Sequence, residues 1–550
     1  MDLTIPLATL ATLGRIFGLI GLSIVTGWIL AYASIRNRTF ENVYIPLVNV
    51  FESIPVIGFL PLVLVAFVLA IPGTLGVEAA VDFLVFDAVA WNIWIGEYQA
   101  FKTVPEHLLE VSENYKFGLL RRMRYLLIPH SVPRITSNIF SSFADAFFYI
   151  SVSEVFTAGP ATAHVCPGGV CSTFGIGTLI VNYLAAGDYT HVFYSLVAIA
   201  VAVIVVTFSL SRLSRWAVAK YGVDTPGVIK RHAGRWRGRI PDAWRKWYAF
   251  RARAWFSRYT PIASDSWHGR EGQAHFSSAK FGKALLVLVA AALLIYVAYS
   301  IVTMIVSIPA ATWYEFLLET PRLLEYVAAD YVRVSVITLV SLVLAVFVGY
   351  FLASHERIGN AVLPLVQAFA AFPAPTYFPL IFIATVPYLE HALPFLYTEV
   401  YIFILGFLSC FYYVFFDFWI GVQAIPSEFL DVVRNNKIPF WTRMRRVIIP
   451  ASLPYLITGL SSTINSAWAG IAIGEYWPDI APKIAPNGLQ APFGMMYYIS
   501  FNMAKGAIGP AAYVSFLFAV VVAIYGIVFT RNLMDLARRK YVVEEGVFAA

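Results

Sequence analysis

Polar and ionisable side chains inside long apolar stretches are the residues of this sequence best placed to do chemistry. Two stretches, 131–156 and 449–474, carry them densely. Burying such groups in an apolar layer is costly, which makes them functional candidates by default. Small hydroxyl residues also allow close helix packing, and for any single one of them packing is the stronger reading. The candidates for a shared polar pathway are Asn49, Glu52, Ser141, Ser142, Asp145, Gln367, Ser462, Thr463, Asn465 and Ser466.

Catalytic and nucleotide-binding motifs are missing from the sequence. No Gly-x4-Gly-Lys-Ser/Thr loop occurs, and Gly282-Lys283 lacks the rest of that motif. No metal-ligand cluster and no hydrolytic triad with plausible spacing stands out. The sequence therefore predicts neither an enzyme nor a metal site.

The elements that must position the polar residues are membrane helices. Hydrophobic residues make up 59% of the 550 positions and charged residues only 13%, whereas soluble domains are about a quarter charged. Only helices or closed barrels satisfy the backbone in lipid, and the alternating short strands of a barrel are absent. We therefore predict an all-α polytopic membrane protein. Its eleven candidate spans are 7–34, 43–71, 79–102, 131–156, 189–211, 283–308, 327–353, 360–387, 395–422, 449–474 and 510–531.

The basic residues predict the orientation. Nearly all of the 39 Lys and Arg fall on one side if segment 103–130 is cytoplasmic, as the positive-inside rule requires. The N-terminus, predicted to be a first helix and not a cleaved signal, is then outside and the C-terminus inside. The net charge of +7 is a topology signal, so nucleic acid is not an expected partner.

Two pairs of residues fall at the outer side in this topology. Glu154 and Glu475 end their spans there, where they either gate an outer mouth or cap a neighbouring loop; the sequence does not separate these roles. Cys166 and Cys171 lie in an external loop, which favours a disulfide over a zinc site.

The chain contains an internal duplication. Segment 45–65 aligns without gaps onto 363–383, and 104–133 onto 425–454, so that Arg15 matches Arg333 and Glu154 matches Glu475. Each copy has an odd number of spans, and the additional span 283–308 restores the orientation of the second copy. We predict two parallel homologous halves with a pathway between them.

The halves and their joint divide the chain into three parts. Residues 1–211 form the first membrane domain and 283–550 the second, with one extra N-terminal helix. Residues 212–282 form a basic, Trp-rich cytoplasmic linker, which contains a segment suited to lie on anionic headgroups. A tether is the simpler interpretation of this linker, and a regulatory role is the alternative.

Each half carries a similar loop between two spans: a short helix that begins at a proline, a polar turn, a basic run and an Ile-Pro. Pro105 and Pro426 suit the first helical position. Acids in the first turn, Glu106 and Glu428, suit the helix dipole. Pro129 and Pro450 are expected to fix the re-entry into the next span. An ordinary basic loop explains the arginines but not this repeated frame.

These loops resemble the signature of the permease subunit of binding-protein-dependent ABC importers (type I), most closely the nitrate/taurine/bicarbonate branch. That signature is Glu-Ala-Ala, three residues, Gly, and then Ile-x-Leu-Pro. Glu110-Val111-Ser112 and Asp431-Val432-Val433 occupy the Glu-Ala-Ala position, and Lys116 and Lys437 replace the Gly. If the Gly provides a left-handed turn, Lys adopts it at a cost, unless a neighbouring Asn takes the strained position: Asn114, Asn435 or Asn436.

The resemblance implies an alternating-access permease with two copies fused in one chain. Two separate ATPase subunits would dock on helices 105–118 and 426–439, and an external binding protein would deliver a small polar solute. No cofactor is expected on this chain, because ATP and Mg would belong to the ATPase subunits. The implied coupling residues are Pro105, Glu106, Glu110, Ser112, Lys116, Pro129, Pro426, Glu428, Asp431, Val433, Lys437 and Pro450.

Two other classes remain as alternatives. An ATP-independent secondary transporter would show inverted repeats, against which the parity of the spans argues. A membrane enzyme or a non-transporting scaffold is a more distant alternative, since no catalytic constellation occurs. Co-purification of an ATPase would favour the importer, whereas gradient-driven uptake by the chain alone would exclude it.

Overall fold

The protein is described here by a computed structural model of the chain. It describes residues 3–53, 73–157, 170–221, 309–423, 427–481, 483–507 and 509–522, together with a few single residues between these ranges. The linker 212–282 beyond Tyr221 and nearly all of the candidate span 283–308 lie outside the described residues.

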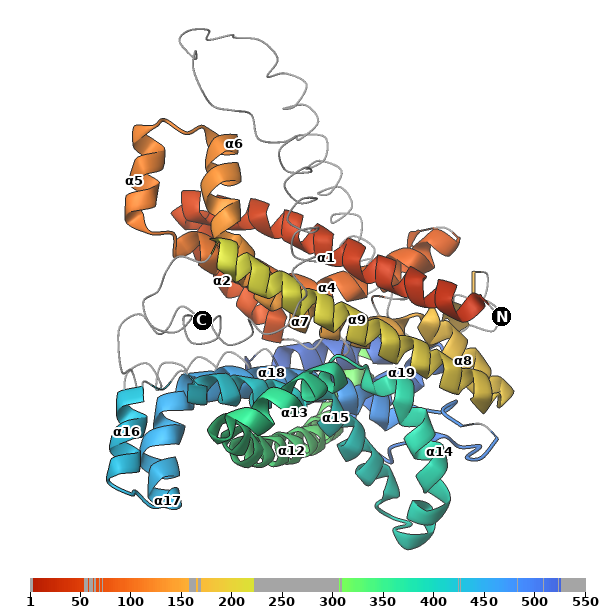
Figure 1. The fold of residues 1–550 in the computed structure, drawn as a ribbon. Helices are drawn as coiled ribbons and strands as arrows, with labels where there is room; N and C mark the ends of the chain where they lie inside the picture. Colours follow the sequence, from red (N-terminus) through yellow and green to blue (C-terminus); the bar gives the residue numbers. More distant parts are fainter. Residues whose placement is uncertain are drawn as a thin grey trace, which may run out of the picture. The chain divides into compact units, whose positions relative to one another are not determined.

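The first half is built from long apolar helices and a short pair of strands (Figure 1). The two strands, β1 (Val155–Thr157) and β2 (Val170–Ser172), pair antiparallel. The long helices are α1 (Thr4–Arg36), α2 (Arg38–Ser53), α4 (Thr74–Lys102), α7 (Ile128–Ser153), α8 (Ile176–Ala186) and α9 (Tyr189–Tyr221).

The second half repeats this order of elements. Its strands, β3 (Tyr476–Trp477) and β4 (Leu489–Gln490), also pair antiparallel. Its helices are α12 (Ala310–Ser354), α13 (Glu356–Ala370), α14 (Ala374–Ala392), α15 (Tyr397–Gln423), α18 (Ile449–Glu475) and α19 (Met495–Ala504).

The described residues bear out the helical membrane fold but not the count of eleven spans. Six helices are long and apolar enough to cross a bilayer, and the bent pair α13–α14 would make a seventh. This pair stands where a continuous span was expected at 360–387, because α13 ends at Ala370 and the backbone is extended at Pro373 (ψ 120°), the N-cap of α14. Three expected spans, 43–71, 283–308 and 510–531, lie wholly or partly outside the described residues.

Two helices run further than the sequence predicted. The span expected at 327–353 is part of one 45-residue helix that begins at Ala310 and passes through Pro321. The helix expected at 189–211 continues to Tyr221. Hydropathy marks where a helix leaves the apolar layer, whereas the helix itself ends only where its hydrogen bonds end.

Each half has a similar packing core of three long helices. In the first half these are α1, α4 and α7, and in the second half α12, α15 and α18. Fully buried aromatic side chains fill it, among them Phe143 and Phe147 in the first half and Trp468 in the second. A methyl group on Gly470 would lie 2.6 Å from the Cα of Gly406. The backbones of α15 and α18 therefore approach as closely as small residues allow in membrane helix pairs.

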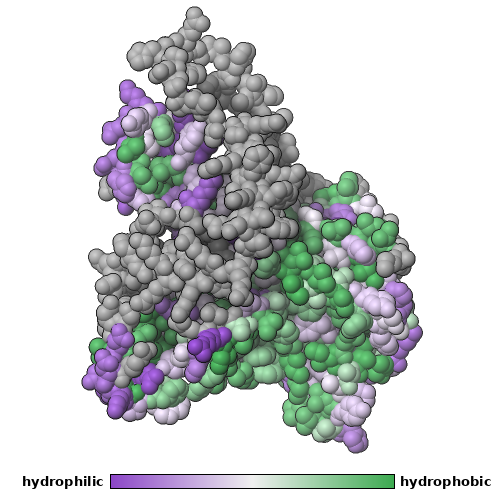
Figure 2. Space-filling view, viewed as in Figure 1, coloured by the Kyte–Doolittle hydropathy of each residue, from purple (hydrophilic) through white to green (hydrophobic). Residues whose placement is uncertain are grey.

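The surface agrees with a membrane environment. Figure 2 shows hydrophobic residues over much of the coloured surface, and hydrophilic residues are dense over the α5–α6 and α16–α17 regions. Large apolar side chains are exposed along the long helices, for example Ile29 on α1 and Leu339 on α12. In a soluble protein such patches would be a liability, but lipid is their expected solvent here.

Candidate functional site

The loop of the first half folds as two short helices. They are α5 (Glu106–Asn114) and α6 (Leu119–Arg122). Pro105 is the N-cap of α5 with ψ 135°, and the helix begins at Glu106. The expected place of Pro105 at the first helical position was therefore wrong by one residue, because its backbone is still extended.

The loop of the second half has the same form. It contains α16 (Ser427–Asn435) and α17 (Phe440–Arg443). Both loops project at the left end of Figure 1, the end opposite α8. Pro426 lies outside the described residues, and of Glu106 and Glu428 only the backbone is described.

The turn after each loop helix has a left-handed residue. Lys116 has φ 48° and Lys437 has φ 47°, and they are the only non-glycine residues with positive φ in the described part of the chain. The amide of Phe117 donates to the carbonyl of Ser112 at 2.9 Å, and that of Ile438 to Val433 at 3.1 Å. This hydrogen bond is the Schellman pattern, whose left-handed position usually holds Gly.

The two lysines thus take the conformation that the family signature assigns to Gly. The alternative, in which Asn114, Asn435 or Asn436 carries the strain, was wrong, because none of them has a positive φ.

The Glu-Ala-Ala positions of the loop helices divide into an exposed and a buried side. Glu110 and Asp431 are exposed, whereas Ser112 and Val433 are only 2% and 6% exposed. The acid is presented to solvent, whereas the residue just before it, Leu109 or Leu430, packs against an apolar cluster of its own half. Beside the first loop, an ion pair joins α4 to α2: the ammonium group of Lys102 donates a hydrogen bond to Glu41 at 2.6 Å. This bond, with a second from Tyr98, holds the pKa of Glu41 below its usual range.

The Ile-Pro that closes each loop lies inside a continuous helix and not at a re-entry turn. A π-helical turn precedes it in both halves, at Met123–Leu127 and Met444–Ile448. Proline has no amide to donate and crowds the preceding turn, and a π turn shifts the hydrogen bonding around such a position. Pro129 and Pro450 therefore accompany a local change of helix pitch.

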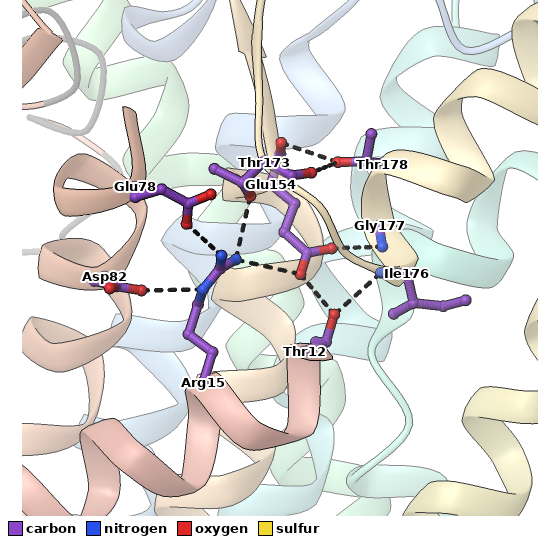
Figure 3. Close-up of polar contacts among 9 residues, drawn as sticks. All are labelled: Thr12, Arg15, Glu78, Asp82, Glu154, Thr173, Ile176, Gly177 and Thr178. Atoms are coloured by element: carbon purple, nitrogen blue, oxygen red, sulfur yellow. Dashed lines mark hydrogen bonds and ion pairs between the residues drawn. The ribbon is translucent and has the colours of Figure 1, made fainter. Parts of the chain in front are cut away.

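At the other end, Arg15 lies in a partly buried group that we term the first charge cluster: Thr12, Arg15, Glu78, Asp82 and Glu154 (Figure 3). The Arg15 guanidinium hydrogen-bonds Glu78, lies 3.1 Å from Asp82 and 3.7 Å from Glu154.

Glu154 binds the start of the next helix. Its Oε2 accepts the amide of Gly177 at 2.6 Å, and its Oε1 accepts the Thr12 hydroxyl at 2.6 Å. The Thr12 hydroxyl in turn accepts the amide of Ile176 at 3.0 Å. The first cluster therefore ties α1, α4 and α7 to the N-terminus of α8, whose unpaired amides and dipole favour an acid.

The second charge cluster consists of Asp330, Arg333, Glu399 and Glu475. Arg333 lies 2.8 Å from both Asp330 and Glu475, and its Nε donates to Glu399 at 2.8 Å. Asp330 accepts the amide of Met495 at 2.8 Å, and Glu475 accepts that of Tyr497 at 2.9 Å. This cluster ties α12, α15 and α18 to the N-terminus of α19.

The two clusters correspond residue by residue. The alignment offsets that match Arg15 with Arg333 and Glu154 with Glu475 also match Glu78 with Glu399 and Thr12 with Asp330. Sequence reasoning missed the Glu78–Glu399 pair, although the same alignment contained it. It considered a gate or a loop cap for Glu154 and Glu475, and the structure places both as caps of the following helix.

The expected pathway residues are only partly brought together. Tyr413 of α15 donates a hydrogen bond to Asp145 of α7, which joins the two halves, and Ser466 lies beside the same hydroxyl. The Ser142 hydroxyl is buried without a hydrogen-bond partner. The side chains of Asn49 and Glu52, on α2, lie outside the described part of the structure.

Other polar candidates contact neighbouring helices within their own half. Asn92 donates to Ser141 at 3.3 Å, and Thr463 accepts the amide of Val414 at 3.2 Å. Gln367, Ser462 and Asn465 are half-buried. Tyr413 and Asn92 were not among the expected residues. The alignment places them at equivalent positions in two apolar stretches, and this matched polar pair could have pointed to both.

The segment that follows β1 in the first half contains a disulfide between Cys166 and Cys171. Cys171 lies on β2, paired with Phe156 of β1 directly after Glu154. Cys410, the remaining cysteine, is fully buried in α15.

A family model matches this chain twice. The binding-protein-dependent transport system inner membrane component covers residues 23–222 and 341–542. The chain belongs to this family, and it holds two copies of the permease module with apolar helices that mark a multi-pass membrane protein.

Individual relatives match only over short segments. The nitrate import permease protein NrtB of Leptolyngbya laminosa is 36% identical over 56 residues, 10% of this chain and 20% of the relative. The putative aliphatic sulfonates transport permease protein SsuC of Bacillus subtilis is 25% identical over 68 residues, 12% of this chain and 25% of the relative. The bicarbonate transport system permease protein CmpB of Synechococcus elongatus is 34% identical over 55 residues, 10% of this chain and 20% of the relative. The matches thus span no more than a quarter of these relatives.

Proposed function

We propose that the chain supplies both permease copies of an ABC importer, fused in one polypeptide. Two separate ATPase subunits, carrying ATP and Mg, dock on α5 and α16, and alternating access between the halves moves the solute. The observation that carries the proposal is the repeated loop: a helix with an exposed acid, a left-handed lysine and a π turn, present in both halves.

The repeat supports a motor partner because it is rigid and doubled. Leu109 of α5 and Leu430 of α16 pack against apolar clusters of their own membrane domains and hold each loop helix there. The Schellman turn fixes its far end. A partner that moves Glu110 or Asp431 therefore moves the attached helices. The other residues assigned to this coupling are Pro105, Glu106, Lys116, Pro129, Pro426, Glu428, Lys437 and Pro450.

The remaining assignments follow from the same proposal. The loops are cytoplasmic, the N-terminus is outside, and an external binding protein delivers the solute to the end where the charge clusters lie. Residues 1–211 and 283–550 are the two permease domains, and 212–282 is a cytoplasmic tether. The solute is small and polar, of the nitrate, sulfonate or bicarbonate kind, because the relatives are permeases for such anions.

Co-purification tests the partner. A tagged chain should retain an ATPase subunit at two copies per chain, and the reconstituted complex should take up solute only with ATP and the binding protein. Gradient-driven uptake by the chain alone would instead support a secondary transporter.

The exposed acids test the docking site. The double variant Glu110→Ala and Asp431→Ala should lose most solute-coupled ATP hydrolysis and release the ATPase more readily, with normal membrane insertion. Glu325→Ala, an exposed acid on α12, is the matched control and should behave as wild type. Unchanged coupling in the double variant would count against docking at these helices.

A further inference from the structure

Lys483 forms a hydrogen bond between the two halves at the end opposite the loop helices. It lies in the segment between β3 and β4 of the second half, and its Nζ donates to the carbonyl of Ala186 in the first half at 2.5 Å. Ala186 is the last residue of α8, which ends at the left-handed Gly187 with φ 70°. A helix C-terminus has unpaired carbonyls and a partial negative charge, and both favour a cation.

The segment of Lys483 and helix α8 are each attached to a glutamate of a charge cluster, Glu475 and Glu154 respectively. On the second half, the amide of Ala491 donates to the carbonyl of Glu475 at 2.7 Å, and Ile480 and Leu489 are fully buried. These contacts attach the segment of Lys483 to the end of α18. On the first half, Glu154 holds the amide of Gly177 and thereby the start of α8.

The Lys483 contact differs from the clusters in strength. It is a single exposed hydrogen bond to a neutral carbonyl, made by a side chain with four flexible methylenes. Each cluster instead has one guanidinium that contacts three carboxylates, at least one of them fully buried. A movement that separates the halves at this end would therefore break the Lys483 contact and leave each cluster intact.

We propose that Lys483 is a releasable latch that holds the outer ends of the two halves together while the pathway is closed to the outside. The inference rests on the proposed importer function and adds a gating residue to it. Release of Lys483 from α8 accompanies opening toward the binding protein, and its return accompanies closure.

Substitution tests the latch in the reconstituted complex. Lys483→Met keeps the length and removes the donor, so ATP hydrolysis without the binding protein should rise about fivefold, the population shift expected for a modest coupling energy. Lys483→Arg keeps a donor and should stay near wild type. Equal basal hydrolysis in all three proteins would overturn the latch.

Cross-linking gives an independent measurement. A bis-methanethiosulfonate reagent of about a lysine's length should join the pair Ala186→Cys and Lys483→Cys. Uptake should stop and then recover on reduction, while each single variant and the treated wild type keep transporting. Full uptake in the cross-linked complex would overturn the latch but leave the importer intact, whereas a complex without ATP-dependent uptake in the wild type would overturn the proposed function itself.

Discussion

Arg15 and Arg333 hold aligned positions but work in different surroundings. The carboxylates nearest Arg15, on Glu78 and Asp82, have side chains that are 40% and 42% exposed. Arg333 instead lies between Asp330 and Glu475, whose side chains are fully buried. The first cluster has access to solvent screening, and the second depends on its arginine for neutralisation.

The difference comes from the place of one acid. In the first half it is Asp82 on α4, whose aligned residue is Phe403. In the second half it is Asp330 on α12, whose aligned residue is Thr12. Each cluster keeps one arginine and three carboxylates, and each still binds the amides of the next helix. The two clusters therefore share the number of charged groups and the bonds to the next helix, and they differ in the position of one acid, Asp82 or Asp330.

The largest expected effect follows from removing the arginines. Arg333→Met leaves Asp330 and Glu475 buried without a counter-charge, and breaking such a pair typically costs about 3–5 kcal/mol. Arg15→Met should cost clearly less, because solvent screens Glu78 and Asp82. Thermal unfolding in detergent measures both variants side by side. Equal losses would remove the distinction between the clusters.

Moving the acid tests whether position matters. Asp330→Thr removes one charge-assisted bond to Arg333 but keeps a hydroxyl for the amide of Met495, so a loss of about 1.5–3 kcal/mol is expected. Thr12→Asp combined with Asp82→Phe gives the first half the arrangement of the second. This double variant should be more stable than Thr12→Asp alone. If it is less stable, the two clusters are not interchangeable.

The left-handed lysines predict a gain in stability. Lys116→Gly or Lys437→Gly removes a strained side chain at φ near 48°, and relief of about 1 kcal/mol is expected. Alanine at the same positions removes the charge but keeps the strain, which makes it the control. Stabilisation by alanine equal to that by glycine would show that charge, and not backbone strain, limits these turns.

The smallest effect concerns the basic runs of the loops. Arg122 lies 3.4 Å from the exposed Glu113, and Arg122→Ala should cost about 0.5 kcal/mol or less. The aligned Arg443 instead donates to the Tyr350 hydroxyl at 2.9 Å and to the carbonyl of Ile438 at 3.1 Å. Arg443→Ala should therefore cost more, about 1 kcal/mol. A larger loss from Arg122→Ala in the same unfolding assay would reverse this ranking.

Much of the arrangement could be predicted from the sequence because the chain contains an internal duplication, and matched residues in the two copies point to equivalent positions. The alignment gave the loop positions and the matched Arg15–Arg333 and Glu154–Glu475 pairs. It did not give the partners of those residues, because most of these contacts join different helices and depend on how the helices pack; Arg15 and Glu78, for example, are 63 residues apart. Tyr413 against Asp145 is of this kind. The number of spans stays a prediction, because three of them lie wholly or partly outside the described residues. Hydropathy also did not show the bend before Pro373, since an apolar run carries no information on where a helix changes direction.

The continuous helix from Phe440 to Glu475 has 36 residues, and at about 1.5 Å per residue it is roughly 54 Å long. Its Phe440 end joins the loop on which an ATPase would dock, and its other end is bound to α19 through Glu475. If an ATPase tilts this helix slightly at its Phe440 end, the opposite end moves sideways together with α19. The movement then needs no chain of local side-chain changes between the two ends.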